Sequence, residues 1–356
     1  MTDGTDPAAG PVRPETSELF SSWTDPDSGV ESHLLEADSL GLGPTETVPS
    51  PLPNATTDGR LYWVFSDVTE DSWTLTAIDL ESETAHRVAS LDRSAPLPAI
   101  DPATGTVHVL VDGSLETYTP RLTGGDDGRI ERTRSIDAAI LEDAVAGLSR
   151  SANGDRIGFV VDDGETRRIA SIYLPDGEVD IWHSGTVGCD VVQFSPTDPT
   201  VILFAREAST TTTTADAWLA REGLGSRPLG PQLPDRHRAY WWRPDGSGLW
   251  YVEPGSGVGV LDLEIGHRRI VWEQPVRTAH ATHDGETIAA AVVSEDRTAV
   301  RVTDGRSTVD VVSPRKYSGD QPWHPHPTFL VGDSYLGYTT FVRDRPTFAV
   351  TPLSEL

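Results

Sequence analysis

The sequence predicts an all-β fold, a seven-bladed β-propeller with four-stranded antiparallel blades. Three observations support this: a turn signal repeats at nearly constant spacing, alternating apolar residues flank each turn, and a second pair of short strands follows most turns. The turns are marked by Gly59, Gly105, Gly154, Asp198, Gly246, Gly285 and Gly332. Successive markers are 46, 49, 44, 48, 39 and 47 residues apart. Seven units of about four short strands are typical of a propeller, whose blades bury their faces against neighbouring blades.

Each unit begins with a Gly/Asp turn between two strands of period-2 alternation. RSANGDRIGFVVDDG (150–164) is one example, and WTLTAIDLESETAHRV (73–88) is an example of the second strand pair. Turns of this composition favour two-residue hairpins. We therefore expect every blade to start with such a hairpin at its inner edge.

The last unit predicts how the ring closes. From about Trp323 to Leu356 it supplies only three strands, whereas SGVESHLLEA (Ser28–Ala37) resembles an outer strand and precedes the first unit. We expect this N-terminal strand to pair with the last blade, because the pairing would hide an otherwise free edge. The predicted organisation is a disordered acidic tail at 1–20 and a single propeller domain at 21–356.

The charge composition limits the possible partners. The chain has 55 Asp and Glu against 28 Lys and Arg, a formal net charge of -27, and Lys316 is its only lysine. Dispersed carboxylates of this density predict a salt-adapted, halophilic surface that stays hydrated at high ionic strength. The alternative is an acidic protein that binds a basic partner. We do not expect a nucleic-acid ligand, because phosphate binding needs clustered cations.

Cysteine use and hydropathy bear on the compartment. Cys189 is the only cysteine, so no disulfide forms within the chain. The N-terminal residues show no signal-peptide pattern, and no apolar run is long enough to cross a membrane. We expect a soluble, cytoplasmic protein without a membrane partner, and the sequence does not predict its oligomeric state.

Two histidines and a glutamine in QPWHPHP (321–327) are the strongest candidates for a site. His324 and His326 are two residues apart, so in an extended strand both side chains face the same way, about 7 Å apart. Gln321 lies three residues earlier, and His280 occupies a comparable position before the turn of the preceding blade. Because inner strands line the channel of a propeller, we expect these four side chains to converge at one mouth.

Three imidazoles and one amide oxygen would suit a divalent transition metal better than calcium, which prefers six or more oxygens. Manganese, iron, nickel and zinc are all compatible with this donor set. The alternative is that each histidine is a hydrogen-bonded or solvated side chain at the channel mouth.

The sequence resembles a known family, the oligogalacturonate lyases, which are seven-bladed, manganese-dependent propellers with TolB-like repeats. The resemblance is carried by VVQFSPTDPTVILFARE (191–207), WWRPDGSGLWYVE (241–253) and QPWHPHPTF (321–329). It implies that Gln321, His324, His326 and His280 hold the metal, with His283 a weaker candidate for the last position. The implied substrate is an acidic oligosaccharide.

The implied reaction is β-elimination at a galacturonate residue. A base removes the proton on C5, and the bond from C4 to the bridging oxygen then breaks. The metal would bind the neighbouring carboxylate and stabilise the charge that develops on it.

The chain departs from this family at the acid-base positions. The family base lies seven residues before the glycine of the W-x-x-D-G turn, which is Ala239 here. His237 is two residues earlier and is the displaced candidate, with Arg236 and Arg238 as charge-stabilising partners. A family arginine falls on Asp216, where a negative charge would repel an anionic sugar.

These observations leave three hypotheses. The first is a metal-dependent lyase acting on oligogalacturonate or a related uronate oligosaccharide. The second is a catalytically degenerate, metal-binding propeller that binds or senses acidic sugars. The third is a protein-interaction scaffold whose histidines are incidental.

Overall fold

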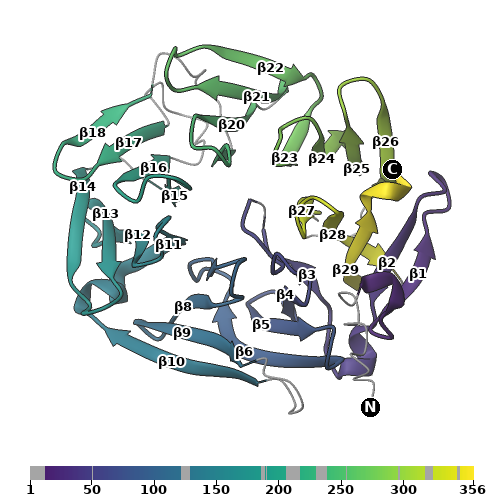
Figure 1. The fold of residues 1–356 in the computed structure, drawn as a ribbon, viewed down its shortest axis with the longest axis horizontal. Coiled ribbons are helices and arrows are strands. Elements are labelled where there is room, and N and C mark those ends of the chain that lie inside the picture. Colours follow the sequence, from purple (N-terminus) through teal and green to yellow (C-terminus); the bar gives the residue numbers. More distant parts are fainter. Residues whose placement is uncertain are drawn as a thin grey trace, which may run out of the picture.

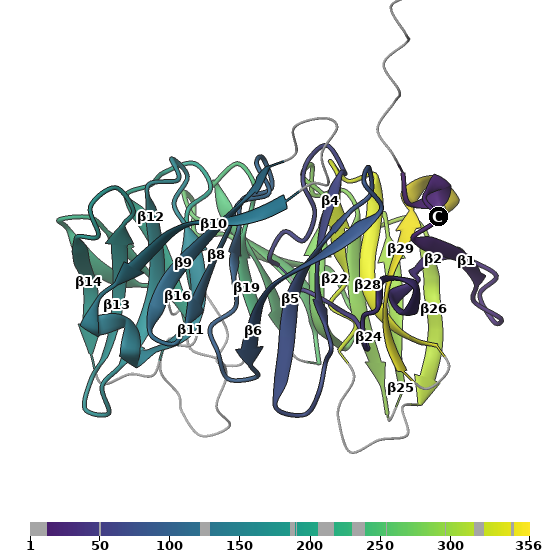
Figure 2. The ribbon, with the colours of Figure 1, turned by 90° about the horizontal axis from the view of Figure 1, so that it is seen from below.

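The computed structural model describes residues 13–49, 51–121, 129–185, 189, 191–205, 217–229, 239–253, 255–295, 297–316, 324–342 and 345–356. Seven antiparallel sheets surround a central axis, which confirms the predicted seven-bladed propeller (Figure 1). Seen edge-on, the strands run between the two faces of the ring (Figure 2).

Six blades are built from four consecutive strands. The first three blades contain β3 (Glu46–Thr47), β4 (Leu61–Ser66), β5 (Ser72–Asp79) and β6 (Thr84–Asp92); β7 (Ala99–Ile100), β8 (Val107–Val111), β9 (Ser114–Arg121) and β10 (Arg129–Asp137); and β11 (Ala144–Arg150), β12 (Arg156–Asp162), β13 (Arg167–Tyr173) and β14 (Val179–Gly185). The next three contain β15 (Val191–Phe194), β16 (Val201–Ala205), β17 (Ala217–Arg221) and β18 (Gly225–Pro228); β19 (Ala239–Trp242), β20 (Gly248–Glu253), β21 (Gly257–Asp262) and β22 (Arg268–Trp272); and β23 (Val276–Ala281), β24 (Ile288–Ser294), β25 (Arg297–Thr303) and β26 (Thr308–Lys316).

The seventh blade joins the two ends of the chain. Its sheet contains β1 (Phe20–Thr24), β2 (Glu31–Leu35), β29 (Arg345–Pro352), β28 (Tyr335–Val342) and β27 (Thr328–Leu330), in that order. His33 and Leu34 of β2 pair with Val350 and Ala349 of β29, which confirms the predicted closure. β1 adds a fifth strand that the sequence did not predict.

Burial follows from the position of each strand within its blade. In β4 all six residues are buried, because neighbouring blades cover both faces of the strand. The outermost strand β10 has seven exposed residues out of nine. Between the fifth and sixth blades, Trp241 and Trp250 pack with Val276 and Ala290 in one apolar cluster. The core is therefore divided into layers between blades.

The first hairpin of each blade lies at its predicted marker, but its loop is longer than expected. In the third blade, Ser151 and Arg156 close the loop by a backbone hydrogen bond, which leaves four residues between them rather than two. Gly154 sits within this loop at φ 76°, a left-handed conformation that costs glycine little. The extra residues let Asn153 accept a hydrogen bond from the Ser151 hydroxyl and donate one to the Asp155 carboxylate within the turn.

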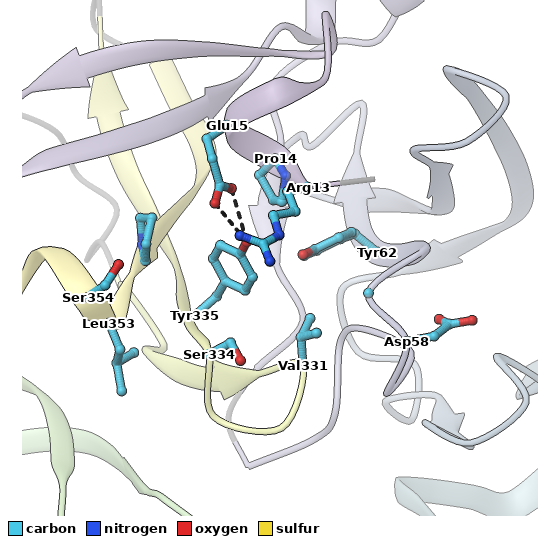
Figure 3. Close-up of a pocket in the computed structure, with 12 residues that line it drawn as sticks. Arg13, Pro14, Glu15, Asp58, Tyr62, Val331, Ser334, Tyr335, Leu353 and Ser354 are labelled. Atoms are coloured by element: carbon cyan, nitrogen blue, oxygen red, sulfur yellow. Dashed lines mark hydrogen bonds between the residues drawn. The ribbon is translucent and has the colours of Figure 1, made fainter. Parts of the chain in front are cut away.

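The expected tail is ordered at its C-terminal end. Residues 1–12 lie outside the described residues, whereas η1 (Pro14–Thr16) packs beside the last blade. Tyr335 donates a hydrogen bond to the Glu15 carboxylate (2.9 Å to Oε1), next to a cavity of about 370 Å³ that Tyr62 also lines (Figure 3). Folded structure therefore begins before residue 21, because this contact anchors the segment to the ring.

Helical structure in the described residues is limited to short 3-10 turns. Besides η1, these turns are η2 (Ala37–Leu40), η3 (Ala139–Asp143) and η4 (Leu353–Glu355). None of the helices in the described part of the chain has the length and apolar character needed to cross a membrane.

Candidate functional site

A cavity of about 850 Å³ lies at the end of the central channel where the inner strands begin, and every blade contributes to it. Its lining comprises Pro49, Pro51 and Leu52; Ala95, Pro96 and Leu97; Val145, Ala146, Gly147 and Leu148; Val191, Val192 and Gln193; Ala239 and Tyr240; Arg277 and Thr278; and His324 and His326. A cavity of this size is within the range of small-molecule binding sites.

The charge of this cavity is opposite to that of the chain as a whole. Of the described residues that line it, none is a carboxylate and only Arg277 carries a formal charge at neutral pH. The protein carries 55 acidic residues, so the absence of carboxylates from the described part of this lining is a local feature. The surroundings favour an anionic ligand over a cationic one.

The structure brings His324 and His326 close together, but just before β27 rather than in the extended strand that the sequence predicted. Their ring centroids are 5.7 Å apart, with the ring planes at 48°. The backbone between them is fixed, because Thr339 N–H donates to the Pro325 carbonyl (2.8 Å) and His326 adopts a left-handed conformation at φ 45°. The two histidines precede β27 and line the same cavity.

Burial keeps both imidazoles neutral near pH 7. It lowers the pKa of His326 to about 3, with a smaller contribution from the neighbouring His324. It also lowers the pKa of His324, and the positive charge of Arg277 acts in the same direction. Each ring can therefore donate one hydrogen bond and accept another at neutral pH.

Two polar atoms of the cavity-lining residues lack hydrogen-bond partners among the described residues. They are Thr278 Oγ1 and His326 Nδ1, and both are shielded from solvent. A buried polar atom without a partner costs free energy, about 1–3 kcal/mol. Such atoms are expected where a ligand completes the site.

His280 does not join the histidine pair, contrary to the sequence-based expectation. It lies on β23, but its side chain lines a separate cavity together with Trp241, Trp250 and Phe329. Its Nδ1 accepts a hydrogen bond from the Phe329 backbone N–H (3.2 Å), so its proton resides on Nε2. Burial also lowers its pKa to about 4. His280 therefore presents a hydrogen-bond donor rather than a free lone pair.

Other predicted site residues are not described. Gln321, His237, Arg236 and Arg238 lie outside the described residues, as does Asp216. The predicted acid-base groups therefore remain sequence-based candidates. His283, the weaker metal candidate, is exposed and forms an ion-pair contact with Asp333 (3.0 Å). Ala239, at the family's base position, does line the cavity.

Arg277 and Thr278 were missed at the sequence level, although a signal existed. Thr278 lies seven residues before the glycine of its turn, the same separation that selects Ala239 in the preceding blade and Gly147 in the third. All three line the cavity. In these three blades a residue seven positions before the turn lies at the mouth, and His280 is two residues further along its strand.

The described donors do not fit a manganese centre. No group of three or more His, Cys, Asp or Glu side chains in the described part of the chain is placed to hold a metal ion. Two neutral imidazoles remain, with a guanidinium nearby. Manganese favours carboxylate, carbonyl and water oxygens, and the described lining offers no carboxylate in place of a third histidine.

Comparison with solved structures finds the same seven-bladed arrangement in oligogalacturonate lyases. One, an oligogalacturonate lyase in complex with manganese, matches with a TM-score of 0.74 and 17% sequence identity, over 94% of this chain and 97% of that chain. The oligogalacturonate lyase from Vibrio parahaemolyticus matches with a TM-score of 0.73 and 15% identity, over 94% and 96% of the two chains. No protein-family model and no curated protein sequence matches. The chain therefore shares its fold, over nearly its whole length, with solved oligogalacturonate lyases.

Proposed function

We propose that this protein binds an acidic oligosaccharide through a uronate carboxylate in the channel-mouth cavity and cleaves it by β-elimination, as an oligogalacturonate lyase-like enzyme. The observation that carries the proposal is the lining of this cavity. Its described residues include no carboxylate and present Arg277, in a protein with a net charge of -27. The similarity to solved oligogalacturonate lyases supports the choice of a uronate.

The elimination needs three contributions from the chain. A cation must neutralise the uronate carboxylate, so that the C5 proton becomes acidic, and Arg277 is placed at the cavity for this role. A base must take the C5 proton, whose bonding electrons form the C4–C5 double bond. The bond from C4 to the bridging oxygen then breaks, and the leaving oxygen takes up a proton. No water is consumed.

Two histidines are candidates for the base. His237 is the sequence-based candidate and lies outside the described residues. His324 is the candidate within the described cavity, as a half-buried imidazole that is neutral at pH 7. Replacing each separately will show which of them the reaction needs.

The expectation of a manganese cofactor rests, among the described residues, on His324 and His326 alone. The solved neighbour in complex with manganese supports a divalent ion for that protein. We assign no step of the reaction to a metal in this chain. Elemental analysis of the purified protein tests the expectation directly, since a bound cofactor would give about one equivalent of metal.

A second candidate function is binding without catalysis. It is favoured by Ala239, whose methyl group lines the cavity at the depth where the resemblance places the base. A propeller that retains Arg277 but lacks a competent base would hold an acidic sugar without cleaving it.

One experiment separates these functions. The protein is mixed with trigalacturonate, with and without manganese, and both heat of binding and the ultraviolet absorbance of an unsaturated uronate are recorded. Neutral galactotriose is the matched control. Binding with absorbance supports the lyase, and binding without absorbance supports the sugar binder. Absence of trigalacturonate binding under both conditions would contradict the proposal. The interaction scaffold would then be the remaining hypothesis.

A further inference from the structure

We infer that Arg277, Thr278 and His326 form a carboxylate-binding corner of the cavity that takes the anionic group without a divalent metal ion. The inference rests on the proposed function, in which the ligand is a uronate, and specifies how that ligand is held. It differs from the sequence-based expectation, in which a metal neutralises the carboxylate.

The relative depth of two neighbouring inner strands brings these residues together. The hydrogen bond from Phe329 N–H to His280 Nδ1 ties β27 to β23. Thr278 lies two residues before His280 on β23, and His326 lies three residues before Phe329, just ahead of β27. Arg277 and Thr278 line the same cavity as His326.

The unsatisfied atoms of this corner match the oxygens of a carboxylate. Thr278 Oγ1 and His326 Nδ1 have no partner among the described residues and are shielded from solvent. A hydroxyl can donate one hydrogen bond, and a neutral imidazole can donate one from Nδ1 in the corresponding tautomer. A carboxylate accepts about four hydrogen bonds, and a guanidinium can add two in parallel. One bound carboxylate would therefore satisfy both atoms and pair with Arg277.

The same residues disfavour a divalent cation. Arg277 lines the cavity beside the two histidines, and no carboxylate among the described lining residues offsets its charge. A dication held by His324 and His326 would be repelled by this guanidinium, whose positive charge already contributes to lowering the pKa of His324. The guanidinium instead supplies the positive charge that an anionic sugar requires.

The test is calorimetric titration of trigalacturonate into the intact protein, once in excess EDTA and once with added manganese. The wild-type protein is expected to bind with the same affinity, within about twofold, under both conditions. R277Q is expected to lose at least about tenfold in affinity, because it removes the charge and the paired donors. T278V is expected to lose several-fold while keeping the charge.

R269Q is the matched control, because Arg269 is an exposed arginine on β22 and does not line the cavity. It should bind within about twofold of wild type, and thermal unfolding should show that all variants are folded. Wild-type binding that requires manganese, or R277Q binding as tightly as R269Q, would overturn the inference, and the proposed function would then stand only with another cation in the role given to Arg277. If the wild-type protein does not bind trigalacturonate in either titration, both the inference and the proposed function are overturned.

Discussion

The backbone N–H of Phe329 donates a hydrogen bond to Nδ1 of His280 (3.2 Å), across the boundary between the sixth and seventh blades. This contact fixes the tautomer of His280 and aligns the inner strands of the two blades. It also explains why a histidine at the expected position along the chain is not available as a ligand at the channel mouth.

Replacing His280 separates its structural role from a ligand role. H280A removes the acceptor for the Phe329 N–H and should lower the free energy of unfolding by about 1–3 kcal/mol. H280N places an amide oxygen near the position of Nδ1 and should recover part of this loss. Chemical denaturation measures both. Trigalacturonate affinity should stay within about twofold of wild type in H280N, and a much larger loss would give His280 a direct role in binding.

The turn between β1 and β2 contains a buried carboxylate that anchors it to the sixth blade. Asp25 is 0% exposed, accepts a hydrogen bond from Ser28 N–H (2.9 Å) and pairs with Arg315 (2.6 Å). D25A should destabilise the fold by about 3 kcal/mol, because it leaves these donors without a partner. E131Q is the control, since Glu131 pairs with Arg121 on the surface and such pairs contribute about 1 kcal/mol or less. Equal losses in the two variants would show that Asp25 does not anchor the closure.

His108 should make the second blade sensitive to acid. It is 3% exposed, and burial, with a smaller contribution from Arg150, lowers its pKa to about 4. Because the unfolded chain binds this proton more readily, stability should be complete above about pH 6.5 and decrease as the pH falls toward 4.

The matched variant for this prediction is H108Q, which does not titrate. The decrease in unfolding free energy between pH 7.5 and 4.5 should be smaller in H108Q than in wild type, by on the order of 3 kcal/mol for a group shifted this far. Parallel pH profiles of the two proteins would show that His108 is not the group responsible.

His237 is the sequence-based candidate for the base. If it removes the C5 proton, H237A should lower the rate of elimination by about 10² to 10⁴ while trigalacturonate affinity stays near that of wild type. H324A, tested in parallel under the same conditions, distinguishes the second candidate. If H237A retains turnover and H324A loses it, the base is His324 rather than His237.

The blade count and the ring closure could be predicted from the sequence, because both depend on local signals. Gly154 and the equivalent turn residues mark each inner hairpin, and the alternating pattern of Ser28–Ala37 marks the closing strand. Loop length was less predictable. Side chains such as Asn153 and Asp155 stabilise a four-residue loop, where the Gly/Asp pattern alone suggested a tighter turn.

The site could be predicted only in part, because convergence depends on how neighbouring blades are staggered. His324 and His326 lie in one short segment, so their proximity follows from local geometry. His280 and Thr278 are two residues apart on one strand, and only the alignment with the next blade decides which of them reaches the mouth. Arg277 belongs to no sequence motif. It stands out as an anion-binding candidate only because the described lining residues include no carboxylate.

The most direct test of the central claim is a crystal structure of the protein with trigalacturonate, grown in EDTA. We expect a uronate carboxylate in the channel-mouth cavity, with its oxygens about 3 Å from the Arg277 guanidinium and from Thr278 Oγ1. A sugar bound elsewhere on the ring, or no bound sugar unless a metal ion is supplied to His324 and His326, would contradict it.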